Sequence, residues 1–270
     1  MNKKLLSVPY LFWSALFIIV PLCMVFYYGL TDKTGAFTLE NILAIATPEH
    51  SKALWEALKL AFVSTVICLI LAYPLAMILC GMNSHKDSFI VLIFILPMWM
   101  NFLLRTMAWQ SLLEKTGVIN GILGFLHLPS LNIINTPAAI ILGMVYNFLP
   151  FMVLPIYNVL AKIDKNVVNA ARDLGANPFQ TFLKILLPLS LPGIFSGITM
   201  VFVPALTTFV ISRVLGGGKI LLICNIIEEE FTKTDNWNLG SGLSIVLMLF
   251  IIFNMVISAV TDKDGEVNAL

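Results

Sequence analysis

Charged side chains are scarce in this chain. Only 11% of its 270 residues are Asp, Glu, Lys or Arg, whereas soluble domains carry about 25%. Hydrophobic residues make up 59% of the sequence, and the mean hydropathy is +0.93. These values exclude a soluble domain and indicate an integral membrane protein surrounded by lipid.

Motifs that carry catalysis are missing as well. The Gly-Gly-Gly-Lys sequence at 216–219 lacks the leading glycine spacing of a phosphate-binding loop and is followed by Ile. Cysteines show no paired spacing. The three histidines fall in separate loops, at His50, His85 and His127. We therefore expect no enzyme activity, no metal site and no cofactor on this chain, and no nucleic-acid partner.

Long uncharged runs are what the chain has in abundance. A helix needs about 20 apolar residues to cross a bilayer, and six runs approach or exceed this length. They cover residues 5–30, 60–84, 88–104, 137–161, 185–212 and 237–260. Backbone polar groups in lipid must be hydrogen-bonded internally, so each run is expected to be a helix. The sequence predicts an all-α polytopic membrane protein with six transmembrane helices in a single domain, residues 1–270.

The most specific pattern lies between the fourth and fifth runs. A glycine after two small residues can stop a helix in the left-handed conformation, and Asn177-Pro178 is typical of a helix restart. The segment is therefore expected to be a helix, a glycine break and a second helix. An ordinary helical hairpin would show a similar Ala-Ala-Gly pattern. The residues are Asn169, Ala170, Ala171, Arg172, Asp173, Leu174 and Gly175, then Ile185, Leu186, Leu187 and Pro188.

This spacing resembles the signature of ABC-importer permease subunits. That signature is Glu-Ala-Ala, a glycine four residues after the second alanine, and Ile-x-Leu-Pro, in a cytoplasmic loop that docks into an ATPase. The resemblance implies a type I importer permease fold, with a coupling loop at about residues 162–188. Asn169 replaces the usual Glu of the family, so this position offers no carboxylate to the ATPase.

Further blocks resemble the first permease subunit of spermidine/putrescine importers. They are residues 148–157, 169–176, 180–182, 188–194 and 216–223, with 97–101 and Arg105. The resemblance implies half of a polyamine pathway in a bacterial inner membrane. It also implies a second permease, two copies of a cytoplasmic ATPase that bind ATP and Mg, and an extracytoplasmic polyamine-binding protein. Alternatives are a permease for another small solute, such as thiamine or a phosphonate, or a stand-alone secondary transporter or channel.

Orientation is not set by charge alone. With both termini inside, the 16 Lys and Arg residues divide evenly between the two sides of the membrane. The basic pair Lys3 and Lys4 before the first run, and the resemblance, favour cytoplasmic termini.

A few polar and aromatic residues interrupt the third and fourth runs. Polar groups in spans tend to face a cavity or one another, and aromatic faces attract cations. Candidate pathway residues are Trp99, Asn101, Arg105, Tyr146 and Asn147. The alternative is that Trp99 is an interfacial anchor, Asn101 a helix-helix hydrogen bond, and Arg105 an end residue that snorkels to water.

An acidic cluster precedes the last run. It comprises Glu228, Glu229, Glu230 and Asp235. Its field could attract a polyamine or a basic edge of a binding protein, although charge runs in loops are often merely solvated.

Overall fold

A computed structural model of the chain describes residues 8–81 and 96–267. In these ranges the secondary structure is helical, apart from one isolated bridge between Thr31 and Phe37. This confirms the predicted all-α class. The contacts divide the chain into two compact units. One unit comprises the residues up to Trp55 together with Leu222–Ile252, and the other comprises Glu56–Leu221 together with the residues from Phe253 onward.

The first unit holds the N-terminal helices and most of the last one. Its elements are α2 (Val8–Ser14), the π-helix η1 (Ala15–Ile19), α3 (Val20–Gly29), α4 (Glu40–Leu43), the 3₁₀-helix η2 (Ala44–Ala46), the start of α5 (Pro48–Gly81), α14 (Ile223–Thr232) and α15 (Trp237–Val267). The Asn238 amide donates to the carbonyls of Thr31 at 2.7 Å and Tyr28 at 3.1 Å. This ties the beginning of α15 to the end of α3.

The second unit contains the rest of α5 and the middle of the chain. Its further elements are the 3₁₀-helix η3 (Leu96–Trp99), α7 (Phe102–Leu113), α8 (Val118–Phe125), α9 (Pro137–Leu160), α10 (Lys165–Asp173), α11 (Pro178–Thr181), the π-helix η4 (Phe182–Leu186), α12 (Leu187–Thr207) and α13 (Val210–Leu215).

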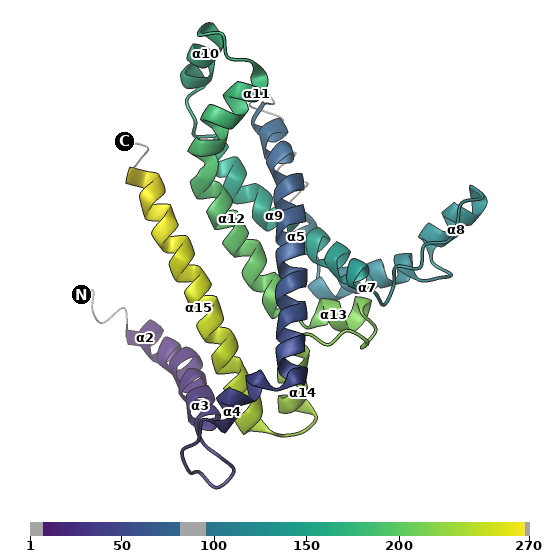
Figure 1. The fold of residues 1–270 in the computed structure, drawn as a ribbon, viewed down its shortest axis with the longest axis vertical. Helices are drawn as coiled ribbons and strands as arrows, with labels where there is room; N and C mark the ends of the chain where they lie inside the picture. The colour runs from purple at the N-terminus through teal and green to yellow at the C-terminus, as the bar shows by residue number, and fades with distance from the viewer. Residues whose placement is uncertain (1–7, 82–95, 268–270) are drawn as a thin grey trace. The chain divides into compact units, whose positions relative to one another are not determined.

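Helices α9 and α12 pack side by side in this unit (Figure 1). A Cβ atom on Gly193 would lie 2.9 Å from the Pro155 carbonyl oxygen, and one on Gly197 would lie 2.7 Å from Met152 Sδ. Small residues allow such close backbone approach where no hydrophobic effect drives helices together in lipid. Both ends of the segment that connects α9 to α12 are therefore attached to closely packed helices.

Five helices within the described ranges are long and apolar enough to cross a membrane. They are Phe12–Gly29, Pro48–Gly81, Pro137–Leu160, Pro178–Thr207 and Trp237–Val256, and they correspond to the first, second, fourth, fifth and sixth predicted runs. Residues 88–95 of the third run lie outside the described residues. Its described end forms η3 and the beginning of α7.

Two boundaries differ from the predicted ones. α5 begins at Pro48 rather than near residue 60, because Ala53 and Ala57 continue the buried helical face through a charged stretch that hydropathy excludes. The fifth run was expected to reach residue 212, but α12 ends at Thr207. The Thr207 hydroxyl donates to the Val203 carbonyl at 3.0 Å, a local bond that competes with helix continuation, and Thr208 is extended.

Candidate functional site

The coupling segment, residues 162–188, connects α9 to α12 at one end of this pair (Figure 1). Its first helix, α10, is capped by Asp164, whose carboxylate accepts from the Asn166 amide at 2.9 Å. The helix ends at Asp173, and Gly175, two residues later, has a φ of +86°. Because left-handed φ values cost side-chain-bearing residues energy, glycine is the residue that suits this stop. The predicted glycine break is confirmed.

The second helix of the coupling segment begins with a capping box. Asn177 Oδ1 accepts from the Gln180 amide at 2.7 Å, and Gln180 Oε1 accepts from the Asn177 amide at 3.0 Å. Pro178 occupies the first turn, where its missing N–H costs nothing. The predicted restart at Asn177-Pro178 is also confirmed, and the coupling segment has the shape of two helices joined by a stiff turn.

The Ile-Leu-Leu-Pro end of the coupling segment contains a wider turn that the sequence did not predict. Residues Phe182–Leu186 form a π-helix, in which the Leu187 amide donates to the Phe182 carbonyl. Pro188 follows and has no backbone N–H to donate to an α-helical hydrogen bond. The π-helix therefore lies where the α-helical hydrogen-bond pattern is already interrupted. Ile185 and Leu187 are half-buried, and Pro188 is exposed.

Burial within the coupling segment separates the two alanines of the motif. The side chain of Ala171 is buried. Ala170 is exposed, as are Asn169, Arg172, Asp173 and Gly175. The largest exposed apolar side chains are Leu174, 89% exposed, and Phe179, 69% exposed. Phe179 was missed, although an aromatic residue directly after a helix-starting proline in a polar loop was a visible signal.

The resemblance implies that the coupling segment docks into an ATPase, and substitutions at Asn169 test whether such a contact is mainly steric. The side chain is exposed, and a neutral amide contributes little long-range electrostatic energy. Asn169→Glu should change transport little, and Asn169→Leu should lower uptake no more than roughly fivefold, about 1 kcal/mol. The measurement is uptake together with copurification of the ATPase. If Asn169→Leu releases the ATPase, the polar side chain holds the interface and the steric interpretation fails.

Trp99 and Asn101 lie where η3 gives way to α7. Trp99 is 81% exposed. Asn101 caps α7, since its Oδ1 accepts from the amides of Leu103 at 2.9 Å and Leu104 at 3.2 Å. The acceptor of Asn101 is therefore used within its own helix, and the alternative of a helix-helix hydrogen bond through this oxygen is not what the structure shows.

Arg105 and Asn147 are buried polar residues of α7 and α9. Arg105 is only 8% exposed, so its side chain does not snorkel. Asn147 donates to the Gly143 carbonyl of its own helix at 2.9 Å. Arg105 Nε and Asn147 Oδ1 have no hydrogen-bond partner among the residues that the structure describes. Unpartnered polar atoms are costly within a membrane, so both residues stay candidates for contact with something outside this chain.

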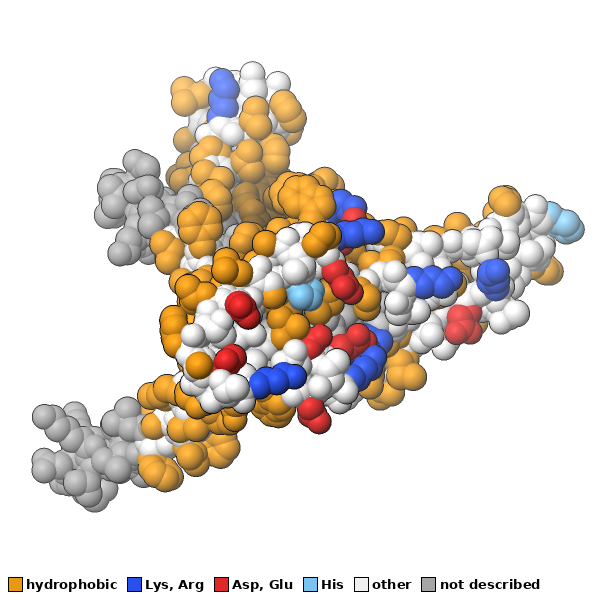
Figure 2. Space-filling view, turned by 60° about the horizontal axis from the view of Figure 1, so that its bottom comes forward, with side chains coloured by type: hydrophobic (Ala, Val, Ile, Leu, Met, Phe, Trp, Pro, Cys, Tyr) orange, Lys and Arg blue, Asp and Glu red, His pale blue; other side chains and the backbone are white. Residues whose placement is uncertain are grey.

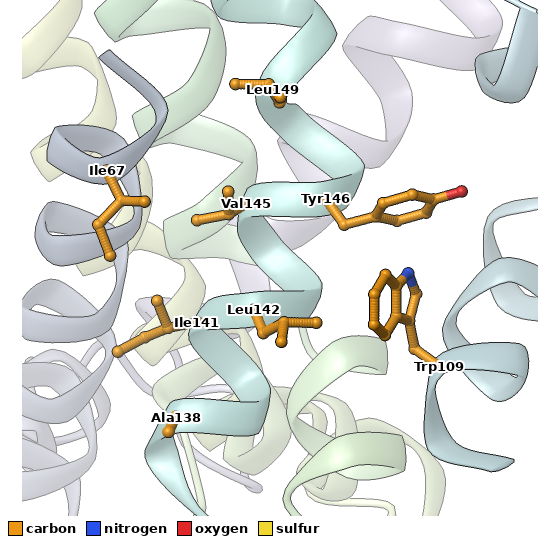
Figure 3. Close-up of a pocket in the computed structure, with 8 residues that line it drawn as sticks. All are labelled: Ile67, Trp109, Ala138, Ile141, Leu142, Val145, Tyr146 and Leu149. Atoms are coloured by element: carbon orange, nitrogen blue, oxygen red, sulfur yellow. The ribbon is translucent and has the colours of Figure 1, made fainter. Parts of the chain in front are cut away.

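Tyr146 lies at the edge of an apolar pocket (Figure 3). Its ring meets Trp109 edge-on, with 5.2 Å between the ring centroids. The pocket has a volume of about 590 Å³, and α9 contributes most of its wall, including Val145 and Leu142, while Ile67 comes from α5. Trp109 was not predicted. It lies four residues after Arg105, on the same helix face, and that spacing could have identified it.

The acidic cluster near α14 is partly neutralised by its neighbours. Glu229 forms an ion pair with Lys233 at 2.6 Å, and Glu230 accepts from the Thr234 hydroxyl at 2.7 Å. Asp235 is exposed with a φ of +52°. Acidic and basic side chains are interspersed in Figure 2 rather than separated into one acidic patch. The negative electrostatic potential of this cluster is accordingly weaker than that of four unpaired carboxylates.

Comparison with known proteins places the chain in a family. Residues 62–263 match the family described as "Binding-protein-dependent transport system inner membrane component". The spermidine/putrescine transport system permease protein PotB of Haemophilus influenzae is 36% identical over 253 residues, 89% of this chain and 88% of that protein. PotB of Escherichia coli K12 is 36% identical over 246 residues, covering 88% and 89% of the two chains.

A solved structure supports the same fold. It is the crystal structure of a bacterial ABC transporter involved in the import of the acidic polysaccharide alginate. One of its chains aligns with a TM-score of 0.79 and 16% identity, covering 95% of this chain and 94% of that one. The matched family region includes the coupling segment and the α9 and α12 pair. The chain therefore belongs to the family of binding-protein-dependent transport system inner membrane components, with the all-α fold of an ABC-importer permease.

Proposed function

We propose that this chain is one of two permease subunits of an ATP-driven importer of spermidine and putrescine, and that it forms half of the translocation pathway. The observation that carries the proposal is the 36% identity to PotB proteins over nearly nine-tenths of the chain. Importers of other solutes share the coupling signature, so that signature does not identify the substrate. The support for a polyamine substrate comes from sequence identity across the other spans.

The coupling segment docks into one copy of a cytoplasmic ATPase. Exposed Leu174 and Phe179 supply apolar contact, and the exposed Ala170 permits close approach. Because one segment engages one ATPase, the full importer has a second permease and two ATPase copies. ATP and Mg bind to the ATPase, and this chain carries no catalytic step. Closure of the ATPase dimer draws the coupling segments together and shifts the permeases to the outward-open conformation. ATP hydrolysis then returns the permeases to the inward-open conformation.

The proposed importer sits in a bacterial inner membrane with both termini in the cytoplasm. This places the coupling segment on the ATPase side and the acidic cluster on the outside. An extracytoplasmic polyamine-binding protein delivers substrate there. The acidic cluster supplies the candidates for contact with that protein or with the arriving polyamine, namely Glu228, Glu229, Glu230 and Asp235.

Aromatic side chains fit the chemistry of a polyamine. The substrate alternates ammonium groups with methylene stretches, so it suits π faces for the charges and aliphatic walls for the carbon chain. Trp99 is exposed, and the pair Trp109 and Tyr146 borders an aliphatic pocket. Residues 116–161 contain no carboxylate. Since a buried charge without compensation costs several kcal/mol, acidic groups on the companion permease complete the pathway.

Uptake of labelled spermidine tests the proposed substrate. Trp99→Ala should slow uptake about tenfold, because loss of one cation-π contact costs roughly 1–2 kcal/mol and 1.4 kcal/mol is a factor of ten. Trp99→Phe should retain much of the rate. The measurement uses membrane vesicles that contain the permease, its companion subunits and the binding protein. Unlabelled thiamine and a phosphonate serve as competitors.

Three results would count against the proposal in different ways. Equal uptake by wild type and Trp99→Ala would remove Trp99 from the pathway. Transport of thiamine or a phosphonate in place of spermidine would replace the substrate and leave the permease assignment standing. Uptake without any ATPase in the vesicles would instead favour a stand-alone secondary transporter.

A further inference from the structure

The connection between α7 and α9 contains no charge over a long stretch. From residue 116 to residue 136 there is no Asp, Glu, Lys or Arg. Loops that run through water usually carry such residues, as the loop at Asp32 and Lys33 does in this chain. The composition of the connection therefore resembles that of the spans more than that of a solvated loop.

Part of this connection is a folded arm made by residues 114–131. At its centre is Asn120, which is only 8% exposed. Its amide nitrogen donates to the carbonyls of Glu114 and Leu131, both at 3.0 Å, and its Oδ1 accepts from the Leu131 amide at 2.7 Å. One side chain thus joins the stretch before α8 to the stretch that returns after it.

The C-terminal end of α8 is closed as well. His127 has a φ of +54°, and the amides of His127 and Leu128 donate to the carbonyls of Gly124 at 3.1 Å and Leu123 at 2.9 Å. These bonds provide donors for carbonyl groups that have no partner within the helix at its C-terminal end. The arm holds its shape through its own hydrogen bonds, so the side chains that it exposes are those of an ordered surface.

The exposed face of the arm is apolar. Val118, Ile122 and Phe125 lie at helical positions i, i+4 and i+7, on one face of α8, and are 60%, 56% and 84% exposed. Leu126 and Leu128 continue this surface beyond the helix. A contiguous apolar patch on an exposed element marks a contact with lipid or another apolar surface.

The arm follows α7, whose first residues lie in the predicted third span, residues 88–104. α8 starts shortly after α7 ends and packs on it, and in Figure 1 the arm extends from α7 away from α9. α7 itself exposes Leu103, Leu104 and Met107, the kind of surface that faces acyl chains. A helix at the end of such a segment lies at the level where the hydrocarbon meets the headgroups.

We propose that the α8 arm lies in the outer water–lipid interface of the bilayer, with Val118, Ile122 and Phe125 inserted among the acyl chains. Lipid is the occupant that the observations favour, because the arm combines an apolar face with an absence of charged residues from residue 116 onward and follows the predicted third span. The outer side follows from the orientation in the proposed function, on which this inference rests. The arm would fix the height and tilt of α7, which carries Arg105 and Trp109.

Depth measurements by electron paramagnetic resonance test this placement. Phe125→Cys is labelled with a nitroxide in a variant without native cysteines, and the assembled transporter is placed in phospholipid nanodiscs. Collisions with oxygen report lipid, and collisions with a water-soluble nickel chelate report water. The label is expected about 5–10 Å below the headgroup boundary. Lys33→Cys, in a charged loop on the same side, is the matched control and should collide with the nickel chelate. Leu126→Cys replaces Phe125→Cys if the latter does not assemble.

The two wrong placements have distinct signatures. A label at position 125 that meets the nickel chelate as freely as the label at 33 puts the arm in water and overturns the proposal. A label reached by neither reagent puts the arm against a protein surface, such as the companion permease, and overturns it too. Ile122→Asp should shift the label toward the nickel chelate only if lipid is the occupant. Spermidine uptake by the same preparation tests the proposed substrate separately.

Discussion

Gly175→Val and Ala171→Trp are each expected to abolish ATP-driven uptake while the protein remains inserted in the membrane. Gly175 has a φ of +86° with no atom near the position of a Cβ, so strain rather than a clash limits this position. A β-branched residue there costs of order 1–3 kcal/mol. Ala171 is buried, so an indole at this position must push α10 away from its packing partners. Either change displaces the docking surface.

The matched control for this expectation is Gly175→Asn. Asn adopts the left-handed conformation more readily than other residues that bear side chains, so this variant should keep much of the activity. Membrane amount, ATPase copurification and spermidine uptake are measured together. Normal uptake by Gly175→Val and Ala171→Trp would remove the coupling role of this segment.

Gly193→Leu is expected to lower the amount of folded protein severely. A Cβ atom at this position would lie 2.9 Å from the Pro155 carbonyl oxygen and 3.0 Å from Val159. The backbone oxygen cannot rotate away as a side chain can, so α9 and α12 must separate. Overpacking of this kind costs about 1–3 kcal/mol or more, and every helix contact along the pair weakens with it.

Yield after solubilisation and the unfolding temperature in detergent measure this effect. Gly124→Leu is the control, because it also adds an isobutyl group to a helical glycine but has no atom within 4 Å of the new Cβ. Its yield should stay near that of the wild type. If Gly193→Leu behaves like Gly124→Leu, the close approach of α9 and α12 is not required for folding.

Local signals in the sequence predicted the coupling segment well. The glycine stop at Gly175 and the cap at Asn177 depend on the backbone of a few neighbouring residues, so they can be inferred without knowing what packs around them. Long apolar runs likewise predicted six spans, and five of them correspond to apolar helices within the described residues, because the bilayer imposes length and composition. Both kinds of signal are insensitive to how helices rotate about their axes.

What the sequence did not reveal depends on that rotation. Ala170 and Ala171 are the same residue type at adjacent positions, so the sequence does not distinguish them, yet only the side chain of Ala171 is buried. Tyr146 was singled out as a polar and aromatic residue of a span, but its contact with Trp109 arises where α7 meets α9. Asn101 was expected to face a cavity or a neighbouring helix, whereas it caps α7. Within apolar helices the hydrophobic pattern does not distinguish an interior face from a lipid face, so such contacts emerge only from the packed structure.

The charges of the coupling segment also bear on biosynthesis. After Lys115 the next basic residues are Lys162, Lys165, Arg172 and Lys184, and cations close to the ends of spans are what retains a loop on the cytoplasmic side during insertion. If the proposed orientation holds, the segment that docks into the ATPase also helps to keep the ends of the fourth and fifth spans on the cytoplasmic side. Neutralising these four basic residues in order to study docking would also disturb the insertion of the nascent chain into the membrane. Substitutions at the uncharged Leu174 leave the basic residues, and therefore insertion, unchanged.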